Sequence, residues 1–170
     1  GPTRTLPKVK EEKSTMKSNF VLEAWKRKYM NSEPKEFLEY FWQNLDKKAN
    51  VIWFGEFKYP EELVSSLRTR NLMGGIIQRL QPFAKYLFGT LLMLGDESKQ
   101  MIKIMWVTER ENPENNIPWF LTSEWVDYEI FNWTQADFDK DKARIEQFLT
   151  WDTPDDQFEG FPFMEGKVFR

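Results

Sequence analysis

The amino-acid sequence predicts an α+β fold, a single domain in which α-helices cover an antiparallel β-sheet. Two apolar, aromatic-rich runs, residues 86–94 and 101–107, flank the polar stretch 95–100, which is typical of an antiparallel hairpin. Segments with helical spacing of apolar residues precede and follow this hairpin, so that helices and strands are interspersed. The chain has 170 residues, of which 41% are hydrophobic and 16% aromatic, enough for one core of ordinary domain size.

The first residues are expected to lie outside that core. Gly1-Pro2 is typical of a scar left by tag cleavage, and residues 3–18 are rich in lysine and glutamate with almost no bulky apolar side chain. Such a composition indicates a flexible basic linker. We therefore expect a tag scar and linker over residues 1–18 and a domain over residues 19–170.

Two helices and a strand are expected next. Apolar side chains at helical spacing predict one helix from Ser18, as a cap, to Tyr29. A second helix is predicted with Ser32 as its cap, Pro34 in its first turn and apolar residues through position 45. Alternating apolar residues before Pro60 predict a strand over residues 51–59.

The rest of the chain continues the pattern. A helix is expected over residues 72–84, and the hairpin after it is expected to form the middle of the sheet. A strand is predicted over residues 125–133, the last clear helix over residues 135–151, and a short returning strand over residues 167–169.

Composition excludes much catalytic chemistry. The sequence has no histidine and no cysteine, so imidazole bases, thiol nucleophiles and soft zinc ligands are absent. Asp137-x-Asp139-x-Asp141 resembles the opening of a calcium loop, but Lys142 stands where that loop needs glycine, so these acids are expected in the first turn of a helix. No phosphate-binding glycine motif is present. We expect no enzyme activity, no cofactor and no metal.

Gly74-Gly75 permits two interpretations. The pair either lets a ligand or partner approach the backbone closely or marks a tight packing point within a helix, and the second is favoured.

Charge is distributed unevenly. Residues 1–110 carry a balance of +6 and residues 111–170 a balance of −9, for a net charge of −3. A negative net charge argues against a dedicated nucleic-acid-binding protein that contacts phosphates. A basic patch on one face remains an alternative.

Trp25 beside three basic residues permits two interpretations as well. Core packing with helix-end electrostatics is favoured, and the alternative is an RNA-binding patch in which aromatic rings stack on bases. That alternative module would use these residues: Trp25, Lys26, Arg27, Lys28, Arg68, Arg70 and Arg79. Arg79, Asp127 and Tyr128 are further candidates for a surface or groove, or equally for a structural polar network.

The compartment is indicated only indirectly. The lack of cysteine fits a reducing compartment, and the apolar runs fall far short of the roughly 20 residues that span a bilayer. We expect a cytoplasmic protein with no membrane span.

Several blocks of sequence carry a family resemblance over residues 20–170. In order, they are Phe20-Val21-Leu22-Glu23-Ala24-Trp25-Lys26-Arg27-Lys28-Tyr29, Tyr40-Phe41-Trp42, Glu56-Phe57-Lys58-Tyr59-Pro60-Glu61-Glu62-Leu63, Asn71-Leu72-Met73-Gly74, Gln78-Arg79-Leu80, Trp106-Val107, Trp125-Val126-Asp127-Tyr128-Glu129, and Gly166-Lys167-Val168-Phe169-Arg170. Their order and spacing resemble the carboxy-terminal domain of the translation elongation factor 1 gamma subunit.

The resemblance implies a non-catalytic scaffold or interaction domain that acts in protein synthesis. Such subunits belong to the complex that exchanges guanine nucleotide on the GTPase delivering aminoacyl-tRNA to the ribosome. Other subunits of that complex are implied as partners, joined mainly through an amino-terminal domain that is absent here, with the translation machinery or RNA as further partners. The family supplies no catalytic motif to carry over.

Overall fold

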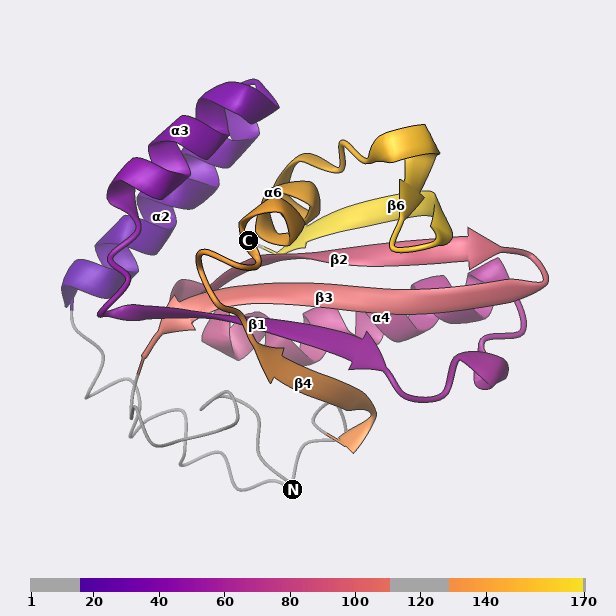
Figure 1. Cartoon of the computed structure of the whole chain (residues 1–170). Coiled ribbons are helices and arrows are strands. Elements are labelled where there is room, and N and C mark those ends of the chain that lie inside the picture. The colour runs from indigo at the N-terminus through magenta and orange to yellow at the C-terminus, as the bar shows by residue number, and fades with distance from the viewer. Residues whose placement is uncertain (1–15, 111–128, 170) are drawn as a thin grey trace.

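The computed structural model describes the backbone of residues 16–110 and 129–169, and side chains from Leu22 onward within those ranges. Six strands form one antiparallel sheet in the order β4-β1-β3-β2-β6-β5 (Figure 1). The strands are β1 (Asn50–Phe57), β2 (Leu87–Asp96), β3 (Lys99–Glu109), β4 (Phe131–Gln135), β5 (Gln157–Phe158) and β6 (Phe161–Phe169). The predicted α+β single domain is confirmed.

Four α-helices and three 3-10 helices complete the described part of the chain. The α-helices are α2 (Met16–Asn31), α3 (Pro34–Asn44), α4 (Ser66–Leu80) and α6 (Lys142–Thr150), and the 3-10 helices are η1 (Pro60–Glu62), η2 (Gln81–Tyr86) and η3 (Pro154–Asp156).

The predicted hairpin is confirmed as β2 and β3, the two central strands of the sheet. Both strands are buried on both faces over nearly their whole length. This explains their continuous apolar runs, because a strand covered on both sides has no reason to alternate with polar residues.

Helices cover the sheet on its two faces. Phe88 contacts the rings of Trp25 and Tyr29 from α2, and Thr90 donates a hydrogen bond of 2.9 Å from Oγ1 to the carbonyl of Phe148 in α6. Because Phe88 and Thr90 lie two positions apart on β2, both helices cover the same face, and α3 joins them there. The helix α4 lies behind the sheet (Figure 1).

The boundaries of α2, α3 and α4 differ from the predictions. The first helix begins at Met16 rather than at a Ser18 cap. Glu33, not Ser32, precedes α3, because Pro34 takes the first helical position. The helix predicted over 72–84 is α4, which begins after Ser65, whose Oγ accepts the N–H of Arg68 at 3.1 Å; residues beyond Leu80 form η2 instead, around Pro82.

The acidic triplet was wrongly predicted to lie within a helix. Asp137 accepts the backbone N–H groups of Asp139 and Lys140, both at 2.9 Å, and Asp141 accepts the N–H of Asp137 at 2.8 Å. The hydrogen bonds from Lys140 and Asp139 lower the pKa of Asp137, and all three bonds close a turn, since aspartate side chains compete with helical hydrogen bonds. The helix α6 therefore begins only at Lys142.

Two strand predictions were displaced. The strand predicted over 125–133 is β4, which begins at Phe131 and continues to Gln135 because its pairing with β1 reaches Trp53; residues 125–128 lie outside the described residues. The returning strand starts at Phe161 rather than at position 167, because β6 pairs with β2 along most of its length.

Candidate functional site

The residues proposed from the sequence do not form one surface. Trp25 is completely buried between Phe41 and Phe88, so its ring is not available to stack on a base. Arg27 is exposed on α2 and Arg79 on α4. Asp127 and Tyr128 lie outside the described residues. For Trp25, core packing is therefore the correct interpretation, and the surface interpretation is wrong.

Lys26 has a structural contact. It is buried, and its Nζ donates a hydrogen bond to the carbonyl of Ala84, which ties α2 to η2. Burial lowers the pKa of Lys26, and the nearby Glu23 carboxylate partly opposes that effect. Lys26 thus joins two elements of the fold rather than presenting a charge to solvent.

The basic residues of the RNA hypothesis are divided between the two faces of the sheet. Lys28 lies on α2 and pairs with Glu36 at 3.6 Å, whereas Arg68 and Arg70 lie on α4, where Arg70 pairs with Glu165 at 2.9 Å. With the aromatic residue buried and the cations separated by the sheet, nothing in the described residues supports the RNA alternative.

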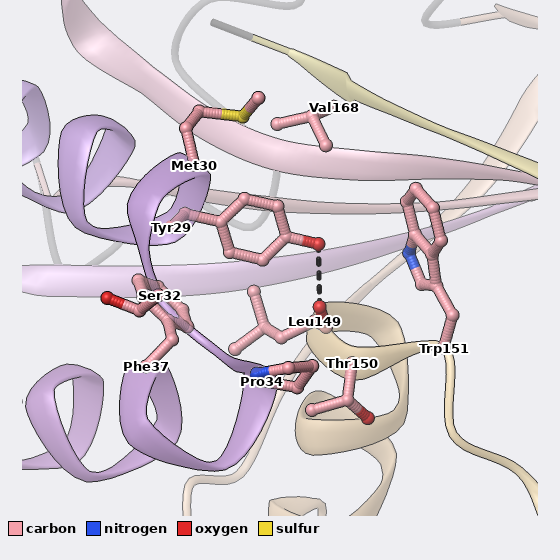
Figure 2. A pocket seen from close by; sticks show the side chains of 9 residues that line it. All are labelled: Tyr29, Met30, Ser32, Pro34, Phe37, Leu149, Thr150, Trp151 and Val168. Atoms are coloured by element: carbon pink, nitrogen blue, oxygen red, sulfur yellow. Dashed lines mark hydrogen bonds between the residues drawn. The ribbon is translucent and has the colours of Figure 1, made fainter.

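A pocket of about 320 Å³ opens where the ends of α2, α3 and α6 meet β6 (Figure 2). Its walls are mainly apolar and aromatic. The lining residues are Tyr29, Met30, Ser32, Pro34, Phe37, Leu149, Thr150, Trp151 and Val168. Tyr29 Oη donates a hydrogen bond of 2.6 Å to the carbonyl of Leu149, and burial raises the pKa of this phenol to about 12. The hydroxyl therefore remains a donor that holds α2 to the end of α6.

Trp151 forms one side of this pocket. It ends α6 in the left-handed conformation, with φ of 59°, which is uncommon for a bulky residue. Its indole lies on Gly166 of β6, where an added Cβ would come within 2.6 Å of ring carbons. The buried indole Nε1 has no hydrogen-bond partner among the described residues. Figure 2 shows this nitrogen on the side of the ring that faces Tyr29.

An ionic cluster anchors the chain that follows Trp151. Lys103 Nζ lies 3.0 Å from a Glu56 oxygen and 2.7 Å from a Glu159 oxygen, with a side chain only 7% exposed. Arg144 donates two hydrogen bonds to Glu159 and stacks over Phe54, with 4.2 Å from its guanidinium carbon to the ring centroid. Burial alone would raise the pKa of Glu159, but hydrogen bonds from Arg144 and Lys103 outweigh it and lower that pKa.

A second hollow lies at the turn of the central hairpin. This groove has a volume of about 510 Å³ and is lined by three apolar residues, Pro60, Leu63 and Val64, and by four polar or charged ones, Glu61, Glu97, Ser98 and Lys99. Around it in the sequence, Tyr59, Val64 and Leu67 are 39%, 68% and 67% exposed. The described residues contain only one other large hydrophobic side chain this exposed, Met30.

Gly74 and Gly75 differ in their surroundings. A Cβ at Gly74 would meet nothing within 4 Å among the described residues, so tight packing does not explain this glycine. A Cβ at Gly75 would come within 2.9 Å of the Arg79 guanidinium. The packing interpretation therefore fails for Gly74.

The described ranges contain neither a metal-binding cluster nor a membrane-spanning helix. Over residues 16–110 and 129–169, no group of three or more acidic residues is placed to hold a metal ion. No helix within those ranges has the length and apolar character needed to cross a bilayer.

Comparison with known proteins decides the family. The sequence model described as "Elongation factor 1 gamma, conserved domain" matches residues 8–112. The chain belongs to the elongation factor 1 gamma family. It is 31% identical over 171 residues to elongation factor 1-gamma-A of Xenopus laevis. That alignment covers 96% of this chain and 38% of the frog protein.

Relatives from a crustacean and a plant show the same family similarity. Elongation factor 1-gamma of Artemia salina is 31% identical over 168 residues, covering 96% of this chain and 38% of that protein. The Prunus avium protein of the same name is 34% identical over 158 residues, covering 90% of this chain and 36% of that protein. This elongation factor 1 gamma chain thus spans well under half the length of the curated relatives it matches.

The two hollows were not predicted from the sequence. Trp151 was expected only as the last residue of a helix, and Val64 and Leu67 fell between predicted elements. An available signal was Val64 in the polar stretch Glu61 to Ser66, where an apolar side chain has few apolar neighbours in the sequence.

Proposed function

We propose that this chain is a non-catalytic, protein-docking domain of the gamma subunit of the translation elongation factor 1 complex, acting in protein synthesis in the cytoplasm. Membership of the elongation factor 1 gamma family supports the complex and the process. The observation that carries the docking role is the groove with the exposed Val64 in its wall, together with the exposed Leu67 three residues further along the chain.

Exposed apolar side chains gathered in one segment are typical of protein-binding surfaces, because scattered exposed leucines and valines are normal but a concentration of them costs solubility. The charged residues that line the groove are Glu61, Glu97 and Lys99, and Glu62 is next in the chain. A complementary occupant is a folded protein surface with an apolar centre and basic residues around it.

We propose further that the domain is the carboxy-terminal one and follows a lysine-rich linker. The motifs from Phe20 to Arg170 support this placement, since they resemble that domain of the family. The other subunits would then be joined mainly through a separate amino-terminal domain. Comparing the length and peptide map of the natural protein with this chain tests the placement.

The docking role is tested by affinity capture from cytoplasmic extract, with and without nuclease, at low and moderate salt, followed by mass spectrometry. We expect subunits of the elongation factor 1 complex or other translation proteins to be retained under all conditions. The double variant Val64→Ser/Leu67→Ser should lose them. Met30→Ser removes an exposed apolar side chain elsewhere and is the matched control, which should retain them.

Two results would contradict the proposal. Capture that disappears with nuclease would favour RNA as the partner, since phosphate contacts are strongly salt-dependent. Capture that is equal for the double variant and Met30→Ser would remove the groove from the docking role.

A further inference from the structure

The outer edge of β6 is open over most of its length. Residues 163–169 pair with β2 on one side, whereas β5 pairs only with Phe161 and Pro162. No other described strand lies along the outer side of β6. An unpaired strand edge presents backbone N–H and C=O groups that another extended chain is able to complete.

The two faces of this edge differ in character. Glu165 and Lys167 lie on the side of α4, where Glu165 pairs with Arg70 at 2.9 Å and approaches Lys167 at 3.8 Å. Gly166 and Val168 lie on the opposite side, with the indole of Trp151 on Gly166 and Val168 in the wall of the pocket. A strand added beside β6 would therefore direct alternate side chains toward the pocket.

The lining and the volume of the pocket favour one apolar side chain as its occupant. Its walls from Tyr29, Phe37 and Val168 suit one branched apolar or aromatic side chain, and about 320 Å³ is room for such a group. The indole N–H of Trp151 is buried without an acceptor among the described residues, so a small turn of the ring on binding would let a peptide carbonyl accept from it.

Acidic residues around the pocket favour basic residues next to the bound apolar side chain. The stretch from Ile145 to Gly166 contains no lysine or arginine, and Asp152, Asp155 and Asp156 in it are exposed. On the other side of the pocket, Glu33 is exposed just before α3, whereas Glu36 pairs with Lys28 and the exposed Lys35 lies between them. Basic residues beside the apolar anchor would complement the three aspartates and Glu33.

We propose that β6 binds an extended peptide segment of another protein by strand addition, with one apolar side chain of that segment in the Trp151 pocket and basic residues flanking it. Strand addition at β6 extends the proposed docking role. It depends on that role only in that the domain is taken to bind proteins. The groove near Val64 and the edge of β6 are separate surfaces, so the two proposals fail independently.

The test uses a synthetic probe, acetyl-Lys-Thr-Val-Leu-Val-Thr-Lys-amide, titrated into the ¹⁵N-labelled chain. We expect saturable shifts of the β6 amides and of one of the indole N–H signals, which Trp151→Phe identifies by its loss. Hydrogen exchange of amides in residues 163–169 should slow at least tenfold at saturation. A peptide with glutamate in place of both lysines, and one N-methylated at alternate residues, should each bind at least tenfold more weakly.

A matched pair of variants separates the pocket from the strand. Val168→Asn should weaken binding at least tenfold, while Lys167→Asn, the same new residue one position away on the other face, should change it less than about twofold. Trp151→Phe should weaken binding about threefold to tenfold through the lost donor. If Val168→Asn does not fold, Val168→Thr replaces it, because its shape is nearly that of valine.

Three results of the peptide experiments would overturn the proposal. They are absence of saturable binding, equal affinity of Val168→Asn and Lys167→Asn, and shifts confined to residues outside β6 and the pocket. Sedimentation of the chain alone as a dimer that Val168→Asn dissociates, with no peptide bound, would also overturn it, because a second copy of the chain would then occupy the edge of β6. Loss of peptide binding with groove-dependent capture intact would leave the proposed function standing.

Discussion

The two hollows of this domain are built in opposite ways. The pocket of Figure 2 is formed by residues that also hold the fold together, such as Tyr29, which bonds α2 to α6, and Trp151, which lies on Gly166. The groove at the hairpin turn is bordered by Val64, whose side chain is 68% exposed, with the similarly exposed Leu67 close by in the sequence.

This difference separates two kinds of evidence for function. Side chains in the pocket are explained in large part by packing, so that only the unpartnered indole N–H and the open strand edge point to a ligand. Exposed side chains beside the groove have little packing to explain them, so their apolar character itself points to a partner. Substitutions should therefore cost stability at the pocket and binding alone at the groove.

The largest effect on stability is expected for Gly166→Ala. Its Cβ would come within 2.6 Å of the Trp151 ring, which must move, and overpacking of this kind costs about 1–3 kcal/mol. Gly74→Ala is the control, because its Cβ has open space and alanine favours helices, so it should stabilise by about 0.5–1 kcal/mol. Urea unfolding measures both, and equal effects of the same sign would contradict the contrast.

Glu159→Gln should destabilise the domain by about 1–2 kcal/mol at pH 7, because it weakens the cluster that anchors the chain after Trp151. The folded pKa of Glu159 is lowered from 4.5, so its charge contributes stability above that value and loses it as pH falls through the folded pKa. The difference between the two proteins should therefore shrink on acidification below about pH 4.5.

Glu56→Gln is the control for that experiment. Glu56 contacts the same Lys103 at 3.0 Å, but its side chain is 46% exposed, and exposed pairs contribute at most about 1 kcal/mol. Urea unfolding from pH 7 to pH 3 compares the three proteins. If the difference in unfolding free energy between wild type and Glu159→Gln stays constant or widens on acidification, the charge of Glu159 does not stabilise the fold through the ionic cluster.

Tyr29→Phe should cost about 1 kcal/mol, because the carbonyl of Leu149 loses its donor. The pKa of Tyr29 is raised from 10.0 to about 12, so the folded state prefers the neutral phenol and its contribution is lost as pH rises through that interval. Tyr59→Phe, near the groove and 39% exposed, should change stability by less than about 0.5 kcal/mol. Urea unfolding measures both variants. An equal loss of unfolding free energy in the two variants would show that the hydrogen bond of Tyr29 does not tie the pocket to the fold.

The smallest effect on stability is expected for Leu67→Ser. Its side chain is 67% exposed, so the free energy of unfolding should change by less than about 0.5 kcal/mol. Thermal unfolding of the free chain checks this. A loss above about 1 kcal/mol would mean that Leu67 serves the core rather than a partner.

The sequence predicted the central part of the fold well because burial on both faces leaves an unmistakable apolar run, as in β2 and β3. It predicted the ends of elements poorly where side chains bond the local backbone. Asp137 and Asp141 close a turn that composition alone presents as the start of a helix. The extent of β6 was hidden because Pro162 and Gly166 disguise a strand that is specified by its pairing with β2.

The candidate sites depend on geometry that a sequence does not reveal. Helical spacing favoured the core for Trp25, whose ring does lie on Phe88, but it did not reveal that the sheet separates the basic residues of α2 from those of α4. The pocket arises because Trp151 adopts a left-handed conformation and comes to rest on Gly166, fifteen residues later. Contacts between distant segments of this kind have no local signature.

The most direct test of the docking role is hydrogen–deuterium exchange of this chain, free and assembled with the translation proteins that it captures. We predict slower exchange at residues 59–67 and at the hairpin turn 96–99 in the complex, with unchanged exchange at the centres of β2 and β3, which are already protected. Unchanged exchange at residues 59–67 in the assembled complex would contradict the account.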